Sequence, residues 1–302
     1  MIARYFTADV FTDRKFGGNQ LAVFPDATGI APDLMPQIAR EFNYSETTFV
    51  LPPNDPSHTA RVRIFTPGGE LQFAGHPTIG TAHVLAVTGN IALTGDETRI
   101  VLEEGVGPVS VTIRARNGVP EFAQLSAAKL PDVGPTAPPN ETLAAMLSLS
   151  RRDIVGGEML PEAVSCGTSF LFVPVVDRAA VGRARVKGDL FDAALAGYVT
   201  GKVYVFAMDP ELPGSHVRAR MFAPGIGVAE DPATGSAAVA LGGYLAARDP
   251  RFEGTLRWVV EQGFEMGRPS ILEVEADKKA GKVTATRVGG RTVMMCEGTM
   301  EL

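Results

Sequence analysis

The sequence has few cysteines, and they are far apart. Among 302 residues only Cys166 and Cys296 occur, and they form no C-x-x-C motif. Disulfide frameworks and thiolate zinc sites need several cysteines at short spacing, so neither is expected. Both cysteines are interpreted as buried apolar residues.

Blocks of positive charge and long apolar runs are also missing. The formal net charge is −6, and Lys and Arg are spread along the chain without interleaved aromatic residues, which excludes a typical nucleic-acid surface. The longest run of small apolar residues, 237–247, is about half of the roughly 20 that a membrane span needs. The N-terminus has no signal-peptide h-region. We therefore expect a cytoplasmic protein that binds neither nucleic acid nor membranes.

Motifs for nucleotides and metals are absent. No G-x-G-x-x-G follows an expected strand, and no G-x-x-x-x-G-K-[S/T] occurs. The histidines show no spacing typical of a metal site: His58, His76, His83 and His216. We therefore expect no organic cofactor and no bound metal.

An internal repeat is present instead, in a chain whose 45% hydrophobic content can form a sizeable core. Two segments share the frame Arg-x-Phe-x-Pro-Gly, followed by x-Pro-x-x-Gly-[Thr/Ser]-Ala: RIFTPGGELQFAGHPTIGTA (63–82) and RMFAPGIGVAEDPATGSA (220–237). After a gap, the alignment pairs His76 with Asp231. A weaker match relates 18–24 to 167–173. The repeat indicates a duplicated lobe.

Each copy predicts a strand, a Pro-Gly turn and a helix that starts with proline. The helices are expected over 77–88 and 232–247, with His76 and Asp231 as their N-caps. Both are apolar nearly all round, which is typical of buried helices. The sequence thus favours an α+β fold of two lobes, each a mostly antiparallel sheet wrapped around one central helix.

The rest of the chain is interpreted mainly as strands. They are expected at 2–11, 19–24, 48–51, 98–103, 108–114, 169–176, 202–208 and 271–276, with short helices at 33–42 and 140–149. A proline-rich stretch, 129–140, follows the first copy. We place the first lobe at 1–118 and the second at 119–302, with the last strand a candidate to return to the first lobe.

The starts of the two repeated helices are candidate functional positions. An aspartate before proline and a helical run, as at Asp231, is more often a helix cap than a catalytic group. In a duplicated fold, however, both helix N-termini can face one cleft. Backbone N–H groups at Gly75–His76 and Gly235–Ser236 would there attract the carboxylate of a small-molecule ligand.

One further acid, Glu46, stands out in FNYSETTF (42–49). It lies between an expected short helix and a strand of β-branched and aromatic residues. A lone acid in such a place is more often a surface or capping residue than a base. The residues alone leave both interpretations open.

Six motifs together resemble the phenazine-biosynthesis PhzF-like family. In order they are DVFTDRKFGGNQLAVF, NYSETTF, RIFTPGGELQFAGHPTIGTA, VSCGTSFLFVPV, RMFAPGIGVAEDPATGSAA and EQGFEMGRPSILEV, and they span nearly the whole chain. The resemblance implies a diaminopimelate epimerase-like fold with the active site between two similar lobes. Two positions depart from the family pattern: Gln20, where proline is frequent, and Ala74, where cysteine is frequent.

The resemblance also implies an activity and a set of site residues. It implies a cofactor-independent isomerase that moves a proton within a small unsaturated cyclic amino or hydroxy carboxylic acid. The family's proton-transferring glutamate falls on Glu46, and its supporting histidine and aspartate fall on His76 and Asp231. Its serine and asparagine fall on Ser236 and Asn19, which we assign to substrate binding. A homodimer is what the resemblance suggests.

Three other functions stay open. A racemase or epimerase of a small amino acid would use a cysteine from each lobe at the helix starts, which here read AGHPT and DPATG. A hydrolase built from Ser236, His76 and Asp231 would need a G-x-S-x-G elbow, and none is present. A metabolite-binding protein would use Glu46 only as a hydrogen-bond partner.

Overall fold

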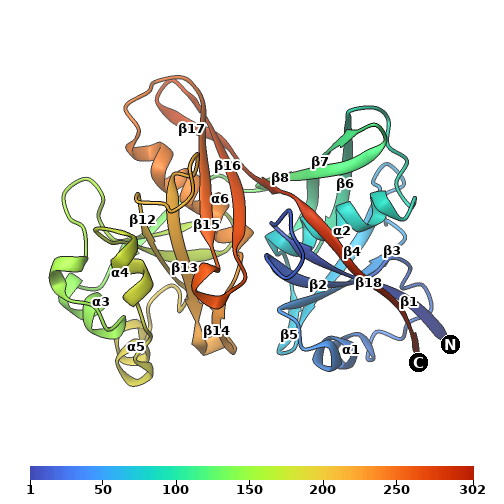
Figure 1. Ribbon diagram of the computed structural model, residues 1–302, viewed down its shortest axis with the longest axis horizontal. Helices are drawn as coiled ribbons and strands as arrows, with labels where there is room; N and C mark the ends of the chain where they lie inside the picture. Colours follow the sequence, from blue (N-terminus) through green and yellow to red (C-terminus); the bar gives the residue numbers. More distant parts are fainter. The chain divides into compact units, whose positions relative to one another are not determined.

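Two compact units make up the computed structural model, which describes residues 1–302 (Figure 1). Unit 1 contains Met1–Ala128 and Val288–Leu302, and unit 2 contains Lys129–Arg287. Unit 1 therefore extends past residue 118, because the strand that follows, β8 (Val119–Ser126), pairs with the strand before it. The last strand, β18 (Thr292–Glu301), belongs to unit 1.

Unit 1 contains one mostly antiparallel sheet. β1 lies between β18 and β2, antiparallel to both. β2 runs parallel to β3, and β3 runs antiparallel to β4. β4 pairs with β5 and, in parallel, with β6, and antiparallel pairs then lead through β7 to β8. The bounds are β1 (Ile2–Val10), β2 (Asn19–Phe24), β3 (Glu46–Leu51), β4 (Ala60–Thr66), β5 (Gly69–Leu71), β6 (Glu97–Glu104) and β7 (Gly107–Arg116).

Unit 2 repeats this order of pairings. β10 lies between β9 and β11, β11 runs parallel to β12, and β12 runs antiparallel to β13. β13 pairs with β14 and, in parallel, with β15, which pairs with β16. The duplicated fold expected from the sequence is confirmed. The bounds are β9 (Asp132–Thr136), β10 (Glu162–Ser165), β11 (Ser169–Pro174), β12 (Val203–Ala207), β13 (Val217–Ala223), β14 (Val228–Asp231), β15 (Gly254–Gln262) and β16 (Ser270–Lys279). The next strand, β17 (Lys282–Gly290), begins in unit 2 and ends in unit 1.

Each unit has one central helix, α2 (Gly75–Val87) in unit 1 and α6 (Gly235–Arg248) in unit 2. Every residue of α2 except the last is buried, and the helix contacts five strands of its own sheet as well as β18. Small residues permit this close packing: a Cβ on Gly80 would clash with side chains of β1 and β2. The apolar helix surfaces predicted from the sequence therefore pack in the core.

Shorter helices pack on the outside of the sheets. In unit 1, α1 (Met35–Phe42) packs on β3 and β4. In unit 2, a separate apolar cluster gathers α3 (Asn140–Met146), α4 (Arg178–Arg183) and α5 (Gly188–Leu195) around β11 and β12. No helix in the chain combines the length and the apolar character required to cross a membrane.

The central helices do not start where the sequence predicts. Their N-caps are Ala74 and Thr234, whereas His76 is the second residue of α2 and Asp231 is the last residue of β14. The backbone around Asp231 is held in place by distant side chains. Gln262 Nε2 donates to the Asp231 carbonyl at 2.7 Å, and Ser270 Oγ donates to the Pro232 carbonyl at 2.8 Å. These bonds keep the proline outside the helix.

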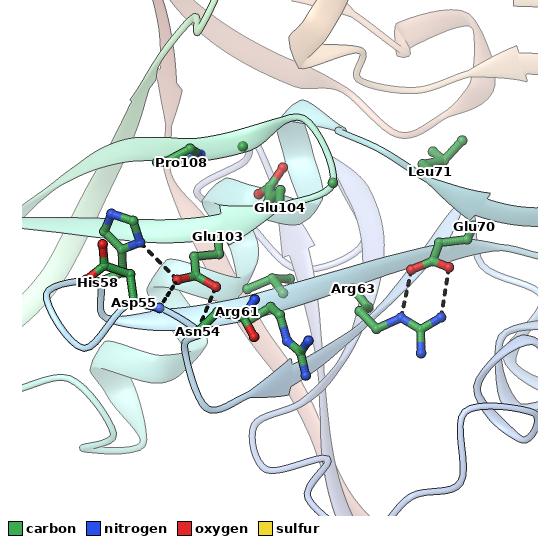
Figure 2. Close-up of a pocket in the computed structure, with 13 residues that line it drawn as sticks. Asn54, Asp55, His58, Arg61, Arg63, Glu70, Leu71, Glu103, Glu104 and Pro108 are labelled. Carbon is green, nitrogen blue, oxygen red and sulfur yellow. Dashed lines mark hydrogen bonds and ion pairs between the residues drawn. The ribbon is translucent and has the colours of Figure 1, made fainter.

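The repeated Arg-x-Phe motif builds the same hairpin in both units. Arg63 on β4 donates from Nε and Nη2 to the two carboxylate oxygens of Glu70, at 2.7 and 2.8 Å (Figure 2). Arg220 on β13 does the same to Glu230, at 2.7 Å in both contacts. Such two-bond forks are the strong form of an ion pair. The carboxylate of Glu230, which precedes Asp231, is therefore paired with Arg220 within the hairpin.

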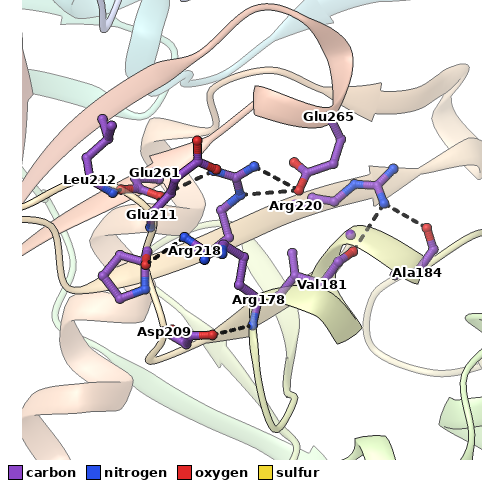
Figure 3. A network of polar contacts seen from close by, with 12 residues as sticks. Arg178, Val181, Ala184, Asp209, Glu211, Leu212, Arg218, Arg220, Glu261 and Glu265 are labelled. Atoms are coloured by element: carbon purple, nitrogen blue, oxygen red, sulfur yellow. Dashed lines mark hydrogen bonds and ion pairs between the residues drawn. The ribbon is translucent and has the colours of Figure 1, made fainter.

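A buried arginine joins two strands inside unit 2 (Figure 3). Arg218 on β13 donates from Nη1 to Glu261 Oε2 on β15 at 3.2 Å, and from Nη2 to Glu265 Oε1 at 3.0 Å. Glu261 is fully buried and also accepts from the backbone N–H groups of Glu211 and Leu212. Because both charges are paired and hydrogen-bonded, their burial is tolerated.

Candidate active site

The first group of candidate residues lies where β2 and β3 begin beside the start of α2. β2 and β3 are parallel, so their first residues, Asn19 and Glu46, come from the same edge of the sheet. His76 is the second residue of α2. Three residues assigned from the sequence to the active site are thus brought together within unit 1.

The histidine ring lies between the other two side chains. His76 Nε2 is 3.2 Å from Glu46 Oε2, and His76 Nδ1 is 3.2 Å from Asn19 Nδ2. A hydrogen bond with the Gln20 backbone also holds the ring. The Nε2 contact has the length of a hydrogen bond without its alignment. Catalytic hydrogen bonds often tighten only when substrate is bound.

Burial decides the charge of this histidine. The side chain is only 4% exposed, and its desolvation lowers the pKa of His76 to about 3, while a hydrogen bond with the Gln20 backbone acts in the opposite direction. The ring is therefore neutral at pH 7. It can donate one proton in a hydrogen bond, but it does not place a positive charge beside Glu46. The Glu46 side chain is 15% exposed, whereas its Oε2 atom, beside His76, is buried.

The second group of candidate residues lies in unit 2, around Asp231. Its side chain is 7% exposed, and Thr234 Oγ1 donates to its Oδ2 at 2.5 Å. Gln262 fixes Thr234 in turn, because its Nε2 lies 2.9 Å from Thr234 Oγ1 and its Oε1 accepts from the Thr234 N–H at 3.2 Å. Tyr204 OH donates to the same Oε1 at 3.1 Å. Asp231 is thus held rigidly.

Sequence reasoning missed the residues that orient this aspartate. Thr234 and Gln262 do lie within two of the motifs that carry the family resemblance, DPATGS and EQGFEMG. The presence of Thr234 and Gln262 in these motifs was the sequence signal that could have identified them as site residues. Tyr204 lies in an ordinary buried strand, and no local pattern distinguishes it.

The helix starts supply the remaining candidates. Gly75 and Gly235 are the first residues of α2 and α6, and His76 and Ser236 are the second. No side chain caps either helix, because Ala74 has no polar group and the Thr234 hydroxyl is bonded to Asp231. Uncapped N–H groups at a helix start, together with the helix dipole, favour binding of an anion.

The two cysteines lie away from these positions. Cys166 is buried between β10 and β11, and burial raises the pKa of its thiol to about 11. Cys296, on β18, is exposed, so the expectation that both cysteines are buried is wrong for it. No three His, Cys, Asp or Glu side chains are grouped so that they could hold a metal ion.

Two duplicated units, each with a sheet around one buried helix, define the diaminopimelate epimerase-like fold. The family described as "Phenazine biosynthesis-like protein" matches residues 8–298. The chain is 37% identical over 299 residues to an uncharacterized isomerase from Mesorhizobium japonicum, covering 98% of each sequence. It is 34% identical over 299 residues to the trans-2,3-dihydro-3-hydroxyanthranilate isomerase of Pseudomonas aeruginosa, again covering 98% of each.

A solved structure agrees with these matches. The crystal structure of a PhzF-family phenazine biosynthesis protein from Bacillus anthracis superposes with a TM-score of 0.89, at 25% identity and over 100% of each chain. The chain therefore belongs to the phenazine-biosynthesis PhzF-like family. It is an isomerase of that family.

Proposed function

We propose that the enzyme moves a proton between carbons of a small unsaturated cyclic amino or hydroxy carboxylic acid, with Glu46 as the general acid/base. The observation that supports this most directly is the contact of 3.2 Å between Glu46 Oε2 and Nε2 of a neutral His76. The name of the relative from Pseudomonas aeruginosa, an isomerase of a dihydro-hydroxyanthranilate, indicates the substrate class.

In the proposed reaction, the Glu46 carboxylate takes a proton from a ring carbon and the double bonds of the substrate shift. The same carboxyl group then returns the proton to a different carbon, so that product and substrate have the same atoms. The His76 ring, with Nε2 beside Oε2, positions the Glu46 carboxyl group during both transfers. A positioned acid/base of this kind is typically worth about 10² to 10⁴ in rate.

Substrate binding falls to the other candidates. The uncapped starts of α2 and α6, at Gly75 and at Gly235–Ser236, are proposed to bind the substrate carboxylate. Asp231, held by Thr234, is proposed to bind the amino or hydroxyl group and to assist the proton transfer. Asn19 is proposed to act mainly through the His76 ring, by holding Nδ1.

The thiol chemistry of a two-cysteine racemase is not proposed. Neither cysteine starts a central helix, and a thiol with a pKa of about 11 has almost no thiolate at pH 7. Without a thiolate in each unit, that mechanism has no base to act on either face of the substrate.

Solvent exchange tests the proposed function. The enzyme is incubated in deuterated water with trans-2,3-dihydro-3-hydroxyanthranilate and with related unsaturated cyclic amino and hydroxy acids, and deuterium on carbon is measured by NMR and mass spectrometry. We expect incorporation into at least one of these acids. Tight binding of such acids without any exchange of a carbon-bound proton would contradict the proposal and favour a metabolite-binding role.

A further inference from the structure

The end of β6 in unit 1 is the counterpart of the end of β15 in unit 2. Arg61 and Arg218 hold the same place in the repeated Arg-x-Arg-x-Phe motif of β4 and β13. In the parallel pairings, Arg61 lies opposite Glu103, and Arg218 lies opposite Glu261. Both glutamates also accept from two consecutive backbone N–H groups of a loop. The residues that follow the two glutamates are therefore equivalent.

These two residues, Glu104 and Gln262, each brace the start of a central helix. In unit 2, Gln262 Nε2 lies 2.9 Å from Oγ1 of Thr234, the N-cap of α6. In unit 1, Glu104 Oε1 lies 2.5 Å from Thr78 Oγ1, and this hydroxyl lies 2.7 Å from the carbonyl of Ala74, the N-cap of α2. The amide of unit 2 cannot ionise, whereas the carboxyl group of unit 1 can.

The protonation state of Glu104 decides how many of the contacts in unit 1 are hydrogen bonds. The Thr78 hydroxyl has one proton, and the Ala74 carbonyl can only accept. When Glu104 is protonated, it donates to Thr78, and Thr78 donates to Ala74. When Glu104 is ionised, both neighbours of the hydroxyl are acceptors, and the charged one binds the proton more strongly. The Ala74 carbonyl then keeps only the Thr78 backbone N–H, at 3.4 Å.

Burial keeps this carboxyl group neutral at pH 7. Glu104 is 7% exposed, and its desolvation raises its pKa to about 8, while the contact with Thr78 acts in the opposite direction. The titratable side chains of α2 are His76 and His83, and burial lowers their pKa values to about 3 and about 4. Both rings are neutral when Glu104 titrates, so they add no charge beside it.

The charged side chains of the neighbouring strands lie elsewhere. Successive side chains of a strand point to opposite faces of its sheet, so Glu103 points away from the face on which Glu104 meets α2. Arg61, its register partner on β4, shares the face of Glu103, as does Arg63 two residues further on. β7 begins opposite Glu104 and has no titratable side chain before Arg114, near the other end of the hairpin.

We propose that Glu104 in its protonated form is a positioning residue for the start of α2, and that its ionisation loosens this start. Through Thr78 it fixes the carbonyl of Ala74, which directly precedes Gly75 and His76. These two residues are proposed to bind the substrate carboxylate and to orient the acid/base, so the inference rests on the proposed function. It adds a loss of activity as the pH rises through 8, caused by a group that acts through Thr78.

The first measurement uses no substrate. The methyl group of Ala74 and the carbon-bound ring protons of His76 are followed in ¹H–¹³C NMR spectra of the full chain from pH 6.5 to 9.5. We expect both to shift in wild type with a midpoint near pH 8. In Glu104→Gln they should not shift, because the amide donates to Thr78 at every pH, as Gln262 donates to its threonine in unit 2.

A variant of the threonine separates positioning from the charge alone. Thr78→Val keeps the shape of the side chain and removes the hydroxyl that links Glu104 to Ala74, so the pH-dependent shift of the Ala74 methyl group should largely disappear. Unmoved resonances in wild type would overturn the proposal. A shift of the wild-type size in Thr78→Val, or in Glu104→Gln, would overturn it as well.

The second measurement is solvent exchange at carbon, with kcat and KM determined over the same pH range. Between pH 7 and pH 9, kcat/KM of wild type should fall at least about fivefold more than that of Glu104→Gln, mainly through KM, because one hydrogen bond at the carboxylate-binding helix start is lost. Glu97→Gln, on the same strand but 48% exposed, is the control and should follow wild type. Thr78→Val should have at pH 7 the low value of wild type at pH 9, and Thr78→Ser should restore it.

The two measurements fail separately. If no acid exchanges a carbon-bound proton, the proposed isomerase reaction fails, and the NMR titration still decides whether Glu104 positions the start of α2. If exchange occurs and the profiles of wild type and Glu104→Gln coincide, the reaction stands and the positioning role is overturned.

Discussion

Nε2 of His76 lies 3.2 Å from Oε2 of Glu46, and both residues belong to unit 1. The proposed acid/base and the ring that orients it are therefore positioned by a single unit, through the start of β3 and the start of α2. The orienting network of Asp231 is likewise contained in unit 2. The side chains that orient Glu46 therefore belong to unit 1, and those that orient Asp231 belong to unit 2.

Glu46→Gln should abolish catalysis and leave substrate binding nearly unchanged. The amide keeps the size of the side chain and one acceptor oxygen, but it cannot take up and return a proton. We expect solvent exchange at carbon to fall at least about 10²-fold, with little change in affinity for a substrate carboxylate. The matched control is Glu41→Gln, an exposed glutamate on α1. Exchange at the wild-type rate in the Glu46 variant would move the acid/base role elsewhere, with Asp231 as the next candidate.

Thr234→Val should expose the role of the network around Asp231. Valine keeps the shape of threonine but removes the hydroxyl that donates to Asp231 Oδ2. We expect kcat/KM to fall about tenfold, and Thr234→Ser to restore most of it, because serine returns the hydroxyl. Asp231→Asn should raise KM and lower kcat, because Asp231 is proposed both to bind the substrate and to assist the proton transfer. A valine variant with wild-type kcat and KM would show that Thr234 only supports the fold.

Replacement of both cysteines should leave turnover largely intact. Cys166 is buried with a raised pKa and Cys296 is exposed, and neither is near a helix start. The double variant Cys166→Ala with Cys296→Ser is compared with wild type by circular dichroism and by solvent exchange. Loss of solvent exchange in a double variant whose circular dichroism spectrum matches wild type would support the thiol mechanism.

The sequence predicted the repeated units and the residues around His76 because these depend on local patterns. Strand 19–24 was predicted at its observed bounds, so the position of Asn19 at a strand start followed. Strand 48–51 begins earlier, at Glu46, because that backbone pairs in register with Leu21 of β2. That pairing is what brings Glu46 to the edge of the sheet beside Asn19.

The remaining features depend on contacts between distant segments. Local capping rules predicted His76 and Asp231 as N-caps, but side chains of β15 and β16 hold the segment after Asp231 outside α6. Arg61 makes no ion pair with Glu103, its register partner on β6, because groups of the loop 54–58 already bind that carboxylate. No pattern within one segment of the sequence contains that information.

Glu261→Gln should destabilise unit 2 strongly. The substitution removes the negative charge that pairs with the buried Arg218 and leaves that cation without its fully buried partner. Because Arg218 keeps its two hydrogen bonds to Glu265, we expect the free energy of unfolding to fall by about 1.5 to 3 kcal/mol, the range for a hydrogen bond to a charged group. The control is Glu211→Gln, because Glu211 contacts the same arginine at 3.6 Å while its side chain is 51% exposed. Exposed pairs are worth about 0 to 1 kcal/mol.

Denaturant unfolding of both variants, followed by fluorescence of the single Trp258 of unit 2, makes the comparison. Similar small losses in the two variants would show that the buried Glu261 contributes no more to stability than the exposed Glu211.

Glu104 should make the enzyme less stable as the pH rises toward 8. The folded state keeps this carboxyl group protonated up to a pKa of about 8, whereas the unfolded chain releases the proton near the ordinary value of 4.5. Between these values the unfolded state binds fewer protons, so this group lowers the free energy of unfolding by up to about 1.4 kcal/mol per pH unit. Burial of His76 and His83, whose pKa values are lowered to about 3 and about 4, acts in the opposite direction below pH 6.5.

The window from pH 6.5 to 8 therefore isolates Glu104 from the two buried histidines. Denaturant unfolding across this window should show a falling stability in wild type and a flatter profile in Glu104→Gln, because glutamine has no proton to lose. Glu97→Gln, on the same strand but 48% exposed, is the control and should follow wild type. Parallel profiles for wild type and Glu104→Gln would show that Glu104 ionises freely in the folded protein.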